Sequence, residues 1–262
     1  MGIKIGIFDS GIGGLSIATA IRETYSNVAI HYIADTQYMP YGDRSKEQIQ
    51  SRARWCANEL VKLNADMIVI ACNTATAASV DMLRQMHDIP IVGVEPDIHF
   101  HHRDPGKINP SNTCVLCTMH TLQSERFTRL KQQRDPEGLI HYKGMKNLAT
   151  LIEAYFQTGR SQLSFKNIVT ELKRELGEHQ FQHIVLGCTH YELIAHLIEA
   201  VTGAKTVSIA KAVARRCQHL LPTLELKPDC GIEHESHIRF MDTRTLKWSL
   251  LDLNYFKTPA YI

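Results

Sequence analysis

The sequence predicts an α/β protein with parallel sheets in two pseudo-symmetric lobes and a cleft between them. Over the first hundred residues, short apolar runs alternate with amphipathic stretches, which is typical of a parallel sheet covered by helices. A connection rich in proline, glycine and asparagine follows between Glu95 and Thr113, and a second alternating region comes after it. Each region holds a cysteine at the end of an apolar run, which indicates two related lobes.

In the first region, the apolar runs predict strands and the amphipathic stretches predict helices. The predicted strands are Ile3–Phe8, Val28–Ala34, Met67–Ala71 and Ile91–Val94. The predicted helices are Leu15–Thr24, Lys46–Leu63 and Ala75–Met86. Apolar side chains recur along one side of the second of these helices, as expected where a helix packs on a sheet.

The second region repeats the pattern, and the chain then returns to the first lobe. The predicted strands are Cys114–Cys117, Ile140–Tyr142 and Ile184–Gly187, with a turn and helix over Thr118–Leu130 and helices over Leu148–Phe156, Phe165–Leu176 and Leu193–Val201. Beyond them we expect a helix over Ala212–Leu221 and edge strands over Ile238–Met241 and Lys247–Leu251. The predicted units are therefore residues 1–96, residues 97–207, and a return segment, 208–262, that packs on the first lobe.

Composition excludes several classes of protein. The chain has 262 residues, and its formal net charge of +2 is too balanced for a nucleic-acid-binding surface. No apolar run approaches the roughly 20 residues of a membrane-spanning helix, and the run that ends before Asp9 is too short for a signal peptide. The seven cysteines are odd in number and scattered. We therefore expect reduced thiols in the cytoplasm, and neither a nucleic acid nor a membrane as a partner.

Cys72 and Cys188 are the most informative residues of the chain. Each follows an apolar run and precedes a helix-like stretch, so each sulfur is expected at the carboxyl end of a strand, where open α/β sheets bind ligands. The amino end of a helix also lowers a thiol pKa. Most cysteines are buried and inert. Two at matching positions could instead face each other across a cleft, one taking a proton from a carbon while the other returns one on the opposite face, which predicts stereoinversion.

Other polar residues lie at the same predicted sheet edge. The turn Asp9-Ser10-Gly11-Ile12-Gly13-Gly14 lacks both the third glycine of a dinucleotide-binding loop and the Gly-Lys-Ser/Thr of a phosphate loop. We interpret it as a site for a small anion such as a carboxylate, held by backbone N–H groups and Ser10. Pro40-Tyr41-Gly42 follows the second strand, and His190 lies two residues after Cys188, where it could accept or supply a proton.

Metal, redox and hydrolase chemistry are disfavoured. The pair Cys114 and Cys117 lies within an apolar strand and has no second pair at zinc spacing, and the histidines of His99–His102 lie in a proline-rich connection. We therefore expect no metal and no cofactor. A nucleophile elbow requires glycines two residues before and after the nucleophile, and neither cysteine has them, which disfavours a cysteine hydrolase.

Five ordered motifs carry a resemblance to a known family. They are Phe8-Asp9-Ser10-Gly11-Ile12-Gly13-Gly14-Leu15, Pro40-Tyr41-Gly42, Ala71-Cys72-Asn73-Thr74-Ala75-Thr76-Ala77, Gly93-Val94-Glu95-Pro96 and Leu186-Gly187-Cys188-Thr189-His190-Tyr191. In order and spacing they resemble the glutamate racemases of the cofactor-independent aspartate/glutamate racemase family. The resemblance implies two flavodoxin-like lobes with the substrate between them, and a cytoplasmic isomerase that interconverts L- and D-glutamate to supply D-glutamate for peptidoglycan.

The resemblance also implies roles for individual residues. Cys72 would take the α-proton of D-glutamate with help from Asp9, and Cys188 that of L-glutamate with help from His190. Glu153 would match a glutamate of the family's second lobe. The substrate pocket would be lined by Ser10, Pro40, Tyr41, Gly42, Asn73, Thr74, Thr118, Thr121 and Thr189. Glutamate would be the small-molecule partner, and a homodimer is an assembly that the sequence allows.

The chain departs from the family pattern at several positions. Glu192 stands where the family usually has proline, and Val207-Ser208-Ile209-Ala210 replaces an Asp-Ser or Asp-Pro. The family's Cys-Pro element is missing near Ile140-His141-Tyr142, and the segment His99–Asp104 is unusually polar. Two alternatives therefore stay open, a racemase of aspartate or another amino acid, and an inactive racemase-like binding protein. The residues Thr189-His190 after Cys188 favour the glutamate branch, because the aspartate branch typically has glutamate after Cys-Thr.

Overall fold

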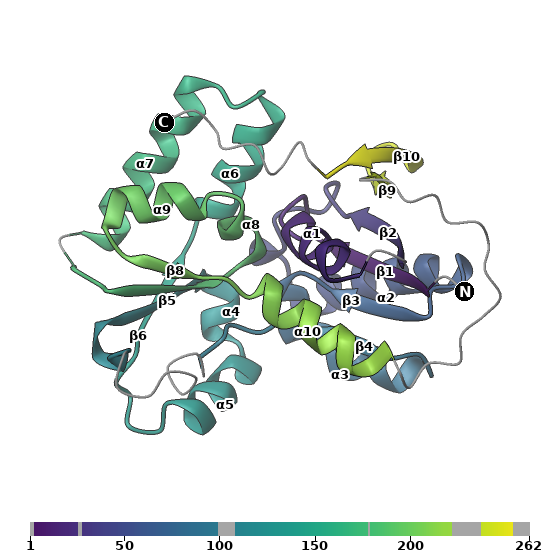
Figure 1. The fold of residues 1–262 in the computed structure, drawn as a ribbon, viewed down its shortest axis with the longest axis horizontal. Helices are drawn as coiled ribbons and strands as arrows, with labels where there is room; N and C mark the ends of the chain where they lie inside the picture. The colour runs from purple at the N-terminus through teal and green to yellow at the C-terminus, as the bar shows by residue number, and fades with distance from the viewer. Residues whose placement is uncertain (1–2, 26–27, 99–107, 178, 222–236, 254–262) are drawn as a thin grey trace.

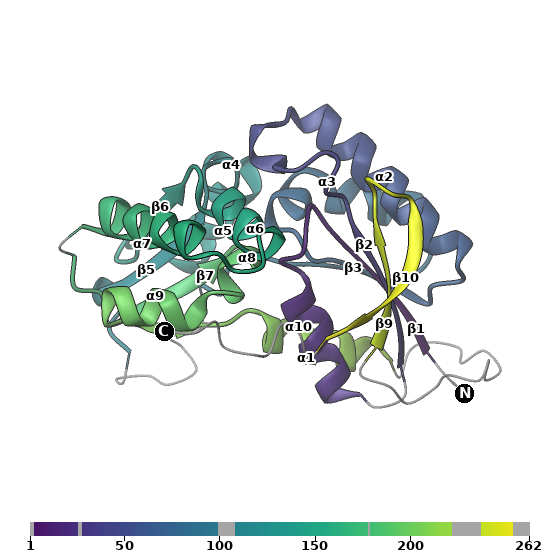
Figure 2. The same ribbon diagram turned by 90° about the horizontal axis from the view of Figure 1, so that it is seen from above.

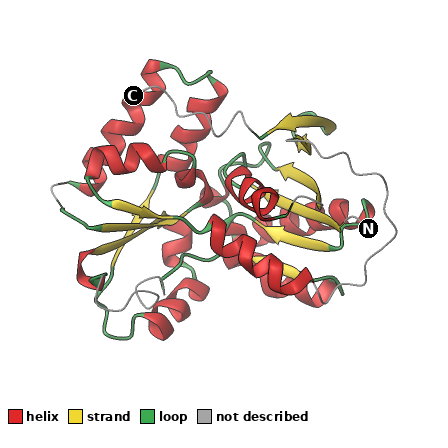
Figure 3. Ribbon diagram, in the orientation of Figure 1, coloured by secondary structure: helices red, strands yellow, loops and turns green. Residues whose placement is uncertain are grey.

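The chain forms two β-sheets lying side by side, each flanked by helices (Figures 1 and 3). This computed structural model describes residues 3–25, 28–98, 108–177, 179–221 and 237–253; the predicted polar segment His99–Asp104 lies outside them. The larger sheet has six strands in the order β10-β9-β2-β1-β3-β4, and the smaller has four in the order β6-β5-β7-β8. Every pair of neighbouring strands is parallel except β9 and β10. The predicted α/β class is confirmed.

The larger sheet is built from both ends of the chain. Its strands are β1 (Ile3–Asp9), β2 (Val28–Ala34), β3 (Met67–Ile70), β4 (Ile91–Gly93), β9 (His237–Asp242) and β10 (Lys247–Asp252). The predicted strands near the end of the chain are confirmed, but only β10 is an edge strand, because β9 pairs with β2 on one side and β10 on the other (Figure 2). The helices of this half are α1 (Leu15–Thr24), α2 (Lys46–Lys62), α3 (Asn73–Met86) and α10 (Ala210–Leu220).

Two apolar layers cover the larger sheet. On one face α1 and α10 pack together over β1 and β2, with Val213, Ala214 and Cys217 buried in that layer. On the other face α2 and α3 bury residues such as Ile49 and Leu60 against β3. Helix α2 begins with a complete capping box formed by Ser45 and Gln48. The division of the chain at residues 96 and 207 stays a prediction.

The smaller sheet is contiguous in sequence. Its strands are β5 (Thr113–Thr118), β6 (His141–Met145), β7 (His183–Gly187) and β8 (Lys205–Val207). Its helices are α4 (Met119–Gln123), α5 (Glu125–Arg134), α6 (Leu148–Gln157), α7 (Gln162–Leu176), α8 (Thr189–Glu192) and α9 (Ala195–Thr202). One face packs against α6, α7 and α9, and α5 covers the other through Phe127. Short 3-10 turns at Tyr41–Asp43 and Pro110–Asn112 complete the described elements.

Some local details of the structure differ from the predictions. The helix predicted over Leu193–Val201 is α9, which begins at Ala195 because its N-cap residue, Ile194, is not helical (φ −122°, ψ 22°), and the short helix α8 before it was not predicted. Strand β8 is too short, at three residues, to show a period in the sequence. Strand β6 extends past Tyr142 to Met145 as an edge strand, and the Tyr142 hydroxyl donates to Asp135 Oδ2. Among the described helices, none is both long enough and apolar enough to cross a membrane.

His31, on β2, gives the larger sheet a pH dependence that can be measured. Burial lowers the pKa of His31 to about 4, and the charges of Arg239 and Lys4 act in the same direction. Because this folded-state pKa is below the unfolded value, the contribution of His31 to stability is complete above about pH 6.5 and is lost as the pH falls toward 4.

We therefore expect His31→Gln to reduce the pH dependence of folding. Urea unfolding of the natural chain should show a loss that includes about 2 kcal/mol from His31 between pH 7 and pH 5. The variant should lack that part of the loss. Equal losses in the two proteins would show that His31 is not held neutral in the sheet.

Candidate active site

The site forms where the carboxyl ends of strands from the two sheets meet. Asp9 ends β1 and Cys72 follows β3 in the larger sheet, while Thr118 ends β5 and Cys188 follows β7 in the smaller sheet. Ligands bind at this edge of parallel sheets because helix amino ends and the loops after the strands converge there. The two sheets thus present the same kind of edge to each other.

Both cysteines line one narrow cavity of about 50 Å³. Drug-sized ligand pockets are about 300–1,000 Å³, so the cleft is closed around its polar groups. Eleven of the residues predicted from the sequence line it, namely Ser10, Pro40, Tyr41, Gly42, Cys72, Asn73, Thr74, Thr118, Cys188, Thr189 and His190. The other three, Asp9, Thr121 and Glu153, lie behind this wall and contact residues in it.

The Cys72 sulfur caps its own helix. Ala75 N–H donates to Cys72 Sγ at 3.4 Å, and the thiol lies 3.7 Å from Ser10 Oγ. The sequence predicted that the helix end would lower the pKa of this thiol, and that prediction is wrong. Burial raises the pKa of Cys72, the nearby charges of Asp9 and Cys188 raise it further, and the single backbone N–H does not offset them. Burial in the closed cleft therefore favours the thiol form of Cys72 over the thiolate.

Asp9 is buried and bridges the two lobes. Its carboxylate accepts hydrogen bonds from Ser10 N–H at 2.7 Å, from Gly14 N–H at 2.6 Å and from the Thr189 hydroxyl of the other lobe at 3.1 Å. Burial raises the pKa of Asp9, against the opposing effects of the His190 charge and these hydrogen bonds. The carboxylate therefore affects Cys72 through its charge, without a direct hydrogen bond to the sulfur.

Cys188 has a different partner. His190 forms a hydrogen bond with Cys188, and its Nε2 lies 2.8 Å from Glu153 Oε2 on α6. Burial by itself lowers the pKa of His190, but the hydrogen bonds with Cys188 and Glu153 and the charges of Glu153 and Asp9 outweigh it, so the pKa is raised well above its usual value. Glu153 also accepts from Ile12 N–H at 3.2 Å. These partners therefore favour the protonated, imidazolium form of His190 beside Cys188.

A set of hydroxyl groups joins the lobes on another side of the cavity. Thr74 Oγ1 on α3 lies 3.1 Å from Thr118 Oγ1 and 3.5 Å from Thr121 Oγ1, and the two residues of the second lobe are 3.0 Å apart. Asn73 Nδ2 donates to the Val94 carbonyl at 3.4 Å, while its buried Oδ1 has no partner within the described part of the protein. These groups are available to hydrogen-bond a polar ligand.

Pro40, Tyr41 and Gly42 are held by a network that the sequence did not predict. The Met39–Pro40 peptide bond is cis. The Tyr41 hydroxyl donates to Asp35 Oδ2 at 2.6 Å, and Arg52 of α2 forms a two-pronged contact with the same carboxylate at 2.9 and 2.7 Å. Such paired guanidinium contacts fix orientation as well as charge. Arg52 thus anchors the turn that lines the cavity.

Several cavity residues were missed by sequence reasoning. They are Met39, Asp43, Met119, His120, Met145, Lys146, Ala149 and Thr150. The signal that identifies Lys146 is its place directly after β6, at the same carboxyl edge as Thr118. Among the described residues, no group of three or more His, Cys, Asp or Glu side chains is arranged to hold a metal ion.

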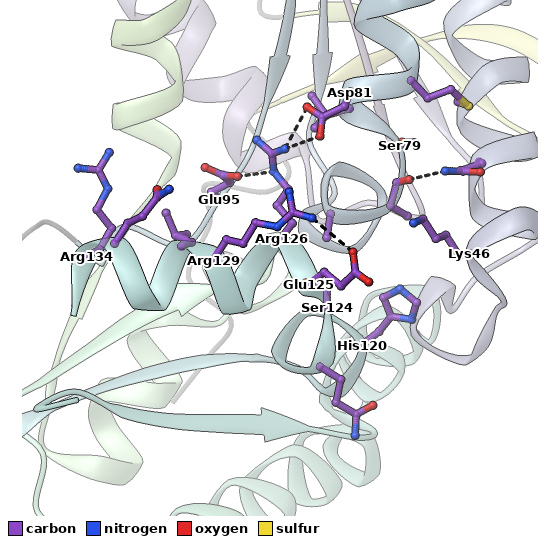
Figure 4. Close-up of a pocket in the computed structure, with 18 residues that line it drawn as sticks. Lys46, Ser79, Asp81, Glu95, His120, Ser124, Glu125, Arg126, Arg129 and Arg134 are labelled. Atoms are coloured by element: carbon purple, nitrogen blue, oxygen red, sulfur yellow. Dashed lines mark hydrogen bonds and ion pairs between the residues drawn. The ribbon is translucent and has the colours of Figure 1, made fainter. Parts of the chain in front are cut away.

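A second, larger cavity of about 650 Å³ lies between α2 and α3 of one lobe and α4 and α5 of the other (Figure 4). Arg126 of α5 crosses it and pairs with Asp81 of α3 at 3.0 Å and with Glu95 (Figure 4). Glu95 belongs to one of the sequence motifs, and its partner is a residue of the other lobe. Arg126 therefore joins the lobes outside the narrow cavity.

Glu192 lies at the far end of the turn that begins with Cys188. Its Oε1 accepts from Ile209 N–H at 2.7 Å, just before α10 begins, and it also hydrogen-bonds Ala210 N–H and Ser208. Burial raises the pKa of Glu192 to about 6, and these hydrogen bonds oppose the rise. The departures predicted at Glu192 and at Val207–Ala210 are thus in direct contact.

The fold and the matched family define a class of α/β isomerases, the racemases. A family model described as Asp/Glu/hydantoin racemase matches residues 15–217, and the chain belongs to this family.

Three similar proteins within this family are named glutamate racemases. The chain is 33% identical over 263 residues to glutamate racemase from Cupriavidus pinatubonensis, covering 98% of this chain and 93% of that one. It is 32% identical over 235 residues to glutamate racemase from Corynebacterium kroppenstedtii, covering 88% and 80%. Among solved structures, glutamate racemase from Escherichia coli in complex with L-glutamate and the activator UDP-MurNAc-Ala has a TM-score of 0.80 at 26% identity, covering 92% of this chain and 89% of that one.

Contact between the lobes at Gly13 can be tested by adding one methyl group. A Cβ at Gly13 would lie 2.6 Å from the His190 backbone nitrogen and 2.7 Å from Thr189 Oγ1. Because backbone cannot yield as a flexible side chain does, Gly13→Ala should destabilise the closed protein by about 1–3 kcal/mol in urea unfolding. Gly42→Ala is the matched stability control, since a Cβ there meets no atom within 4 Å. Equal stabilities for the two variants would contradict a closed contact at Gly13.

Proposed function

We propose that this protein interconverts L- and D-glutamate without a cofactor, using Cys72 and Cys188 as opposed proton carriers. The observation that carries the proposal is the pair of buried thiols, one from each lobe, on a single cavity. Each thiol has its own ionisable partner, Asp9 for Cys72 and His190 for Cys188. A single base would return the proton to the face from which it came, whereas two opposed groups invert the centre.

The proposed reaction conserves protons and charge. Starting from L-glutamate, the Cys188 thiolate removes the α-proton and becomes a thiol, and the electrons of the C–H bond remain on the substrate as a carbanion. The Cys72 thiol then gives its proton to the opposite face and becomes a thiolate. D-glutamate leaves, and the reverse reaction uses the same groups in the opposite order.

The surroundings of the two cysteines suit different roles in this reaction, proton donor for Cys72 and base for Cys188. Burial and the Asp9 charge keep Cys72 protonated, which suits a proton donor. The His190 imidazolium, held by Glu153, stabilises negative charge that develops on the Cys188 sulfur, which suits a base. A general acid and a general base held in place contribute rate factors of about 10²–10⁴ each.

The carbanion needs fixed donors, because an amino-acid α-proton is very weakly acidic. The narrow cavity, of about 50 Å³, leaves room for little water, and in such a site fixed dipoles stabilise charge more strongly than water does. The hydroxyls of Ser10, Thr74 and Thr118, the backbone N–H groups at the start of α3, and Lys146 are available to bind the carboxylates of the substrate. The unpartnered Asn73 Oδ1 is an acceptor for its ammonium group.

Glutamate is preferred over aspartate as the substrate. The relatives that cover most of the chain are named glutamate racemases, and the E. coli structure of the same fold contains L-glutamate. We therefore propose that the protein supplies D-glutamate for peptidoglycan in the cytoplasm.

The first experiment incubates the protein with L-glutamate and, separately, D-glutamate in D₂O. The circular dichroism signal should decay to zero whether the reaction starts from L- or D-glutamate, and NMR should show deuterium entering at the α-carbon. Aspartate should give neither signal. Decay of the signal with aspartate and not with glutamate would instead establish an aspartate racemase. A thermal shift with D-glutamate in the absence of any decay would indicate a binding protein.

Cys72→Ala and Cys188→Ala should each lower kcat/KM at least about a thousand-fold, although each leaves one thiol in place. Cys217→Ala is the matched control, because Cys217 is equally buried but lies in the apolar layer between α1 and α10. Its kcat/KM should match that of the natural chain. Near-normal turnover by either cavity variant would rule out the two-thiol mechanism.

A further inference from the structure

Glu192 supplies a cap to a helix that packs in the other lobe. Helix α10 begins at Ala210, and the residue before it, Ile209, has no side-chain oxygen with which to cap the helix. Glu192 provides the acceptor for Ile209 N–H, and it shares Ala210 N–H with Ser208 Oγ. The first turn of a helix has unpaired N–H groups and favours negative charge, so this carboxylate satisfies both needs from outside the helix.

The contact ties the two halves of the cleft together. Helix α8 is a single turn whose N-cap is Cys188 and whose last residue is Glu192. Helix α10 packs with α1 in the core of the larger sheet. Ser208 lies between β8 of the smaller sheet and α10, where the chain crosses from one sheet to the other. Glu192 therefore holds the catalytic turn against the start of the crossing helix.

The two sequence departures meet in this contact. Ile209, the residue before α10, has no side-chain oxygen, and the carboxylate that accepts from its N–H comes from Glu192. That carboxylate is attached to the turn that carries Cys188 and His190, so capping and positioning become one interaction.

We propose that Glu192 is a positioning residue that fixes the Cys188–His190 turn relative to the first lobe by capping α10. The inference rests on the proposed racemase function for its kinetic test. Free L- and D-glutamate have equal energies in water, so kcat/KM must be the same in both directions. Displacement of the Cys188 turn should therefore lower both values of kcat/KM equally, while kcat and KM change by different factors for the two enantiomers.

The test separates capping from positioning by moving the carboxylate. Glu192→Ala should lower the thermal midpoint by roughly 2–4 °C and kcat/KM roughly tenfold to a hundredfold. Adding Ser208→Asp returns a carboxylate beside Ala210 N–H, which Ser208 Oγ already contacts at 3.2 Å. The double variant should recover the thermal midpoint and leave kcat/KM low. Glu192→Gln, which keeps an oxygen acceptor on α8, should keep most of the turnover.

Glu199→Ala is the matched control. Glu199 on α9 accepts from Thr206 N–H at 2.8 Å and from the Thr206 hydroxyl at 2.7 Å, so its carboxylate also binds backbone near the crossing point, but on β8 instead of α10. This variant should keep the kcat and KM of the natural chain. Recovery of kcat/KM together with the thermal midpoint in the double variant would overturn the proposal, as would normal turnover by Glu192→Ala.

A second readout does not require turnover. The rate at which iodoacetamide alkylates Cys188 and Cys72, measured by mass spectrometry, reports the accessibility and reactivity of each sulfur. Glu192→Ala should change the Cys188 rate relative to the Cys72 rate, because thiol reactivity depends on the surroundings and the exposure of the sulfur, and Glu199→Ala should leave this ratio unchanged. If the natural chain fails to racemise glutamate but this ratio shifts, the proposed function fails and the positioning role stands. An unchanged ratio overturns the positioning role.

Discussion

The closed cleft depends on one carboxylate buried between the lobes. Asp9 accepts hydrogen bonds from the glycine-rich turn that follows β1 and from the Thr189 hydroxyl of the opposite lobe. A buried charge that loses a partner is strongly destabilising. The lobes therefore have to approach closely enough to complete the set of donors, and this approach brings the two cysteines to the same cavity. Small residues at Gly11 and Gly13 make the approach possible, since a Cβ at either would contact His190.

The electrostatics of the cavity follow from that burial. Asp9, His190 and Glu153 are each nearly inaccessible to water, so their charges act on one another and on the sulfurs with little screening. The imidazolium of His190 lies between two carboxylates, and each of them raises its pKa. The same burial raises the pKa of Cys72. A wetter cleft would reduce the pKa shifts of both Cys72 and His190, because solvent would screen the charges and lower the cost of burying them.

Much of the fold could be predicted because its signals are local. Short runs of apolar residues identify β1–β5 and β7. Because ligands bind at the carboxyl ends of parallel strands, Cys72, Cys188 and Asp9 are expected near one site. The direction of the Cys72 pKa could not be predicted, since the helix end is visible in the sequence and burial is a property of the assembled lobes. Likewise, Arg126 pairs with Asp81 across 45 residues and Arg52 pairs with Asp35 across 17, and no sequence period encodes such pairs.

The path of the chain has a consequence for how the molecule is made. The smaller sheet uses consecutive strands from residues 113–207, but the larger sheet needs β9 beside β2, and its core needs Val213 and Ile238. During synthesis from the N-terminus, the apolar layer of β1, β2 and α1 therefore stays incomplete until α10 and β9 emerge. Non-local pairing of this kind slows folding. The larger sheet contains the first strand to be synthesised and also the last strands, so it cannot be completed until the end of synthesis. Until then its exposed apolar residues are the part of the nascent chain most prone to aggregation.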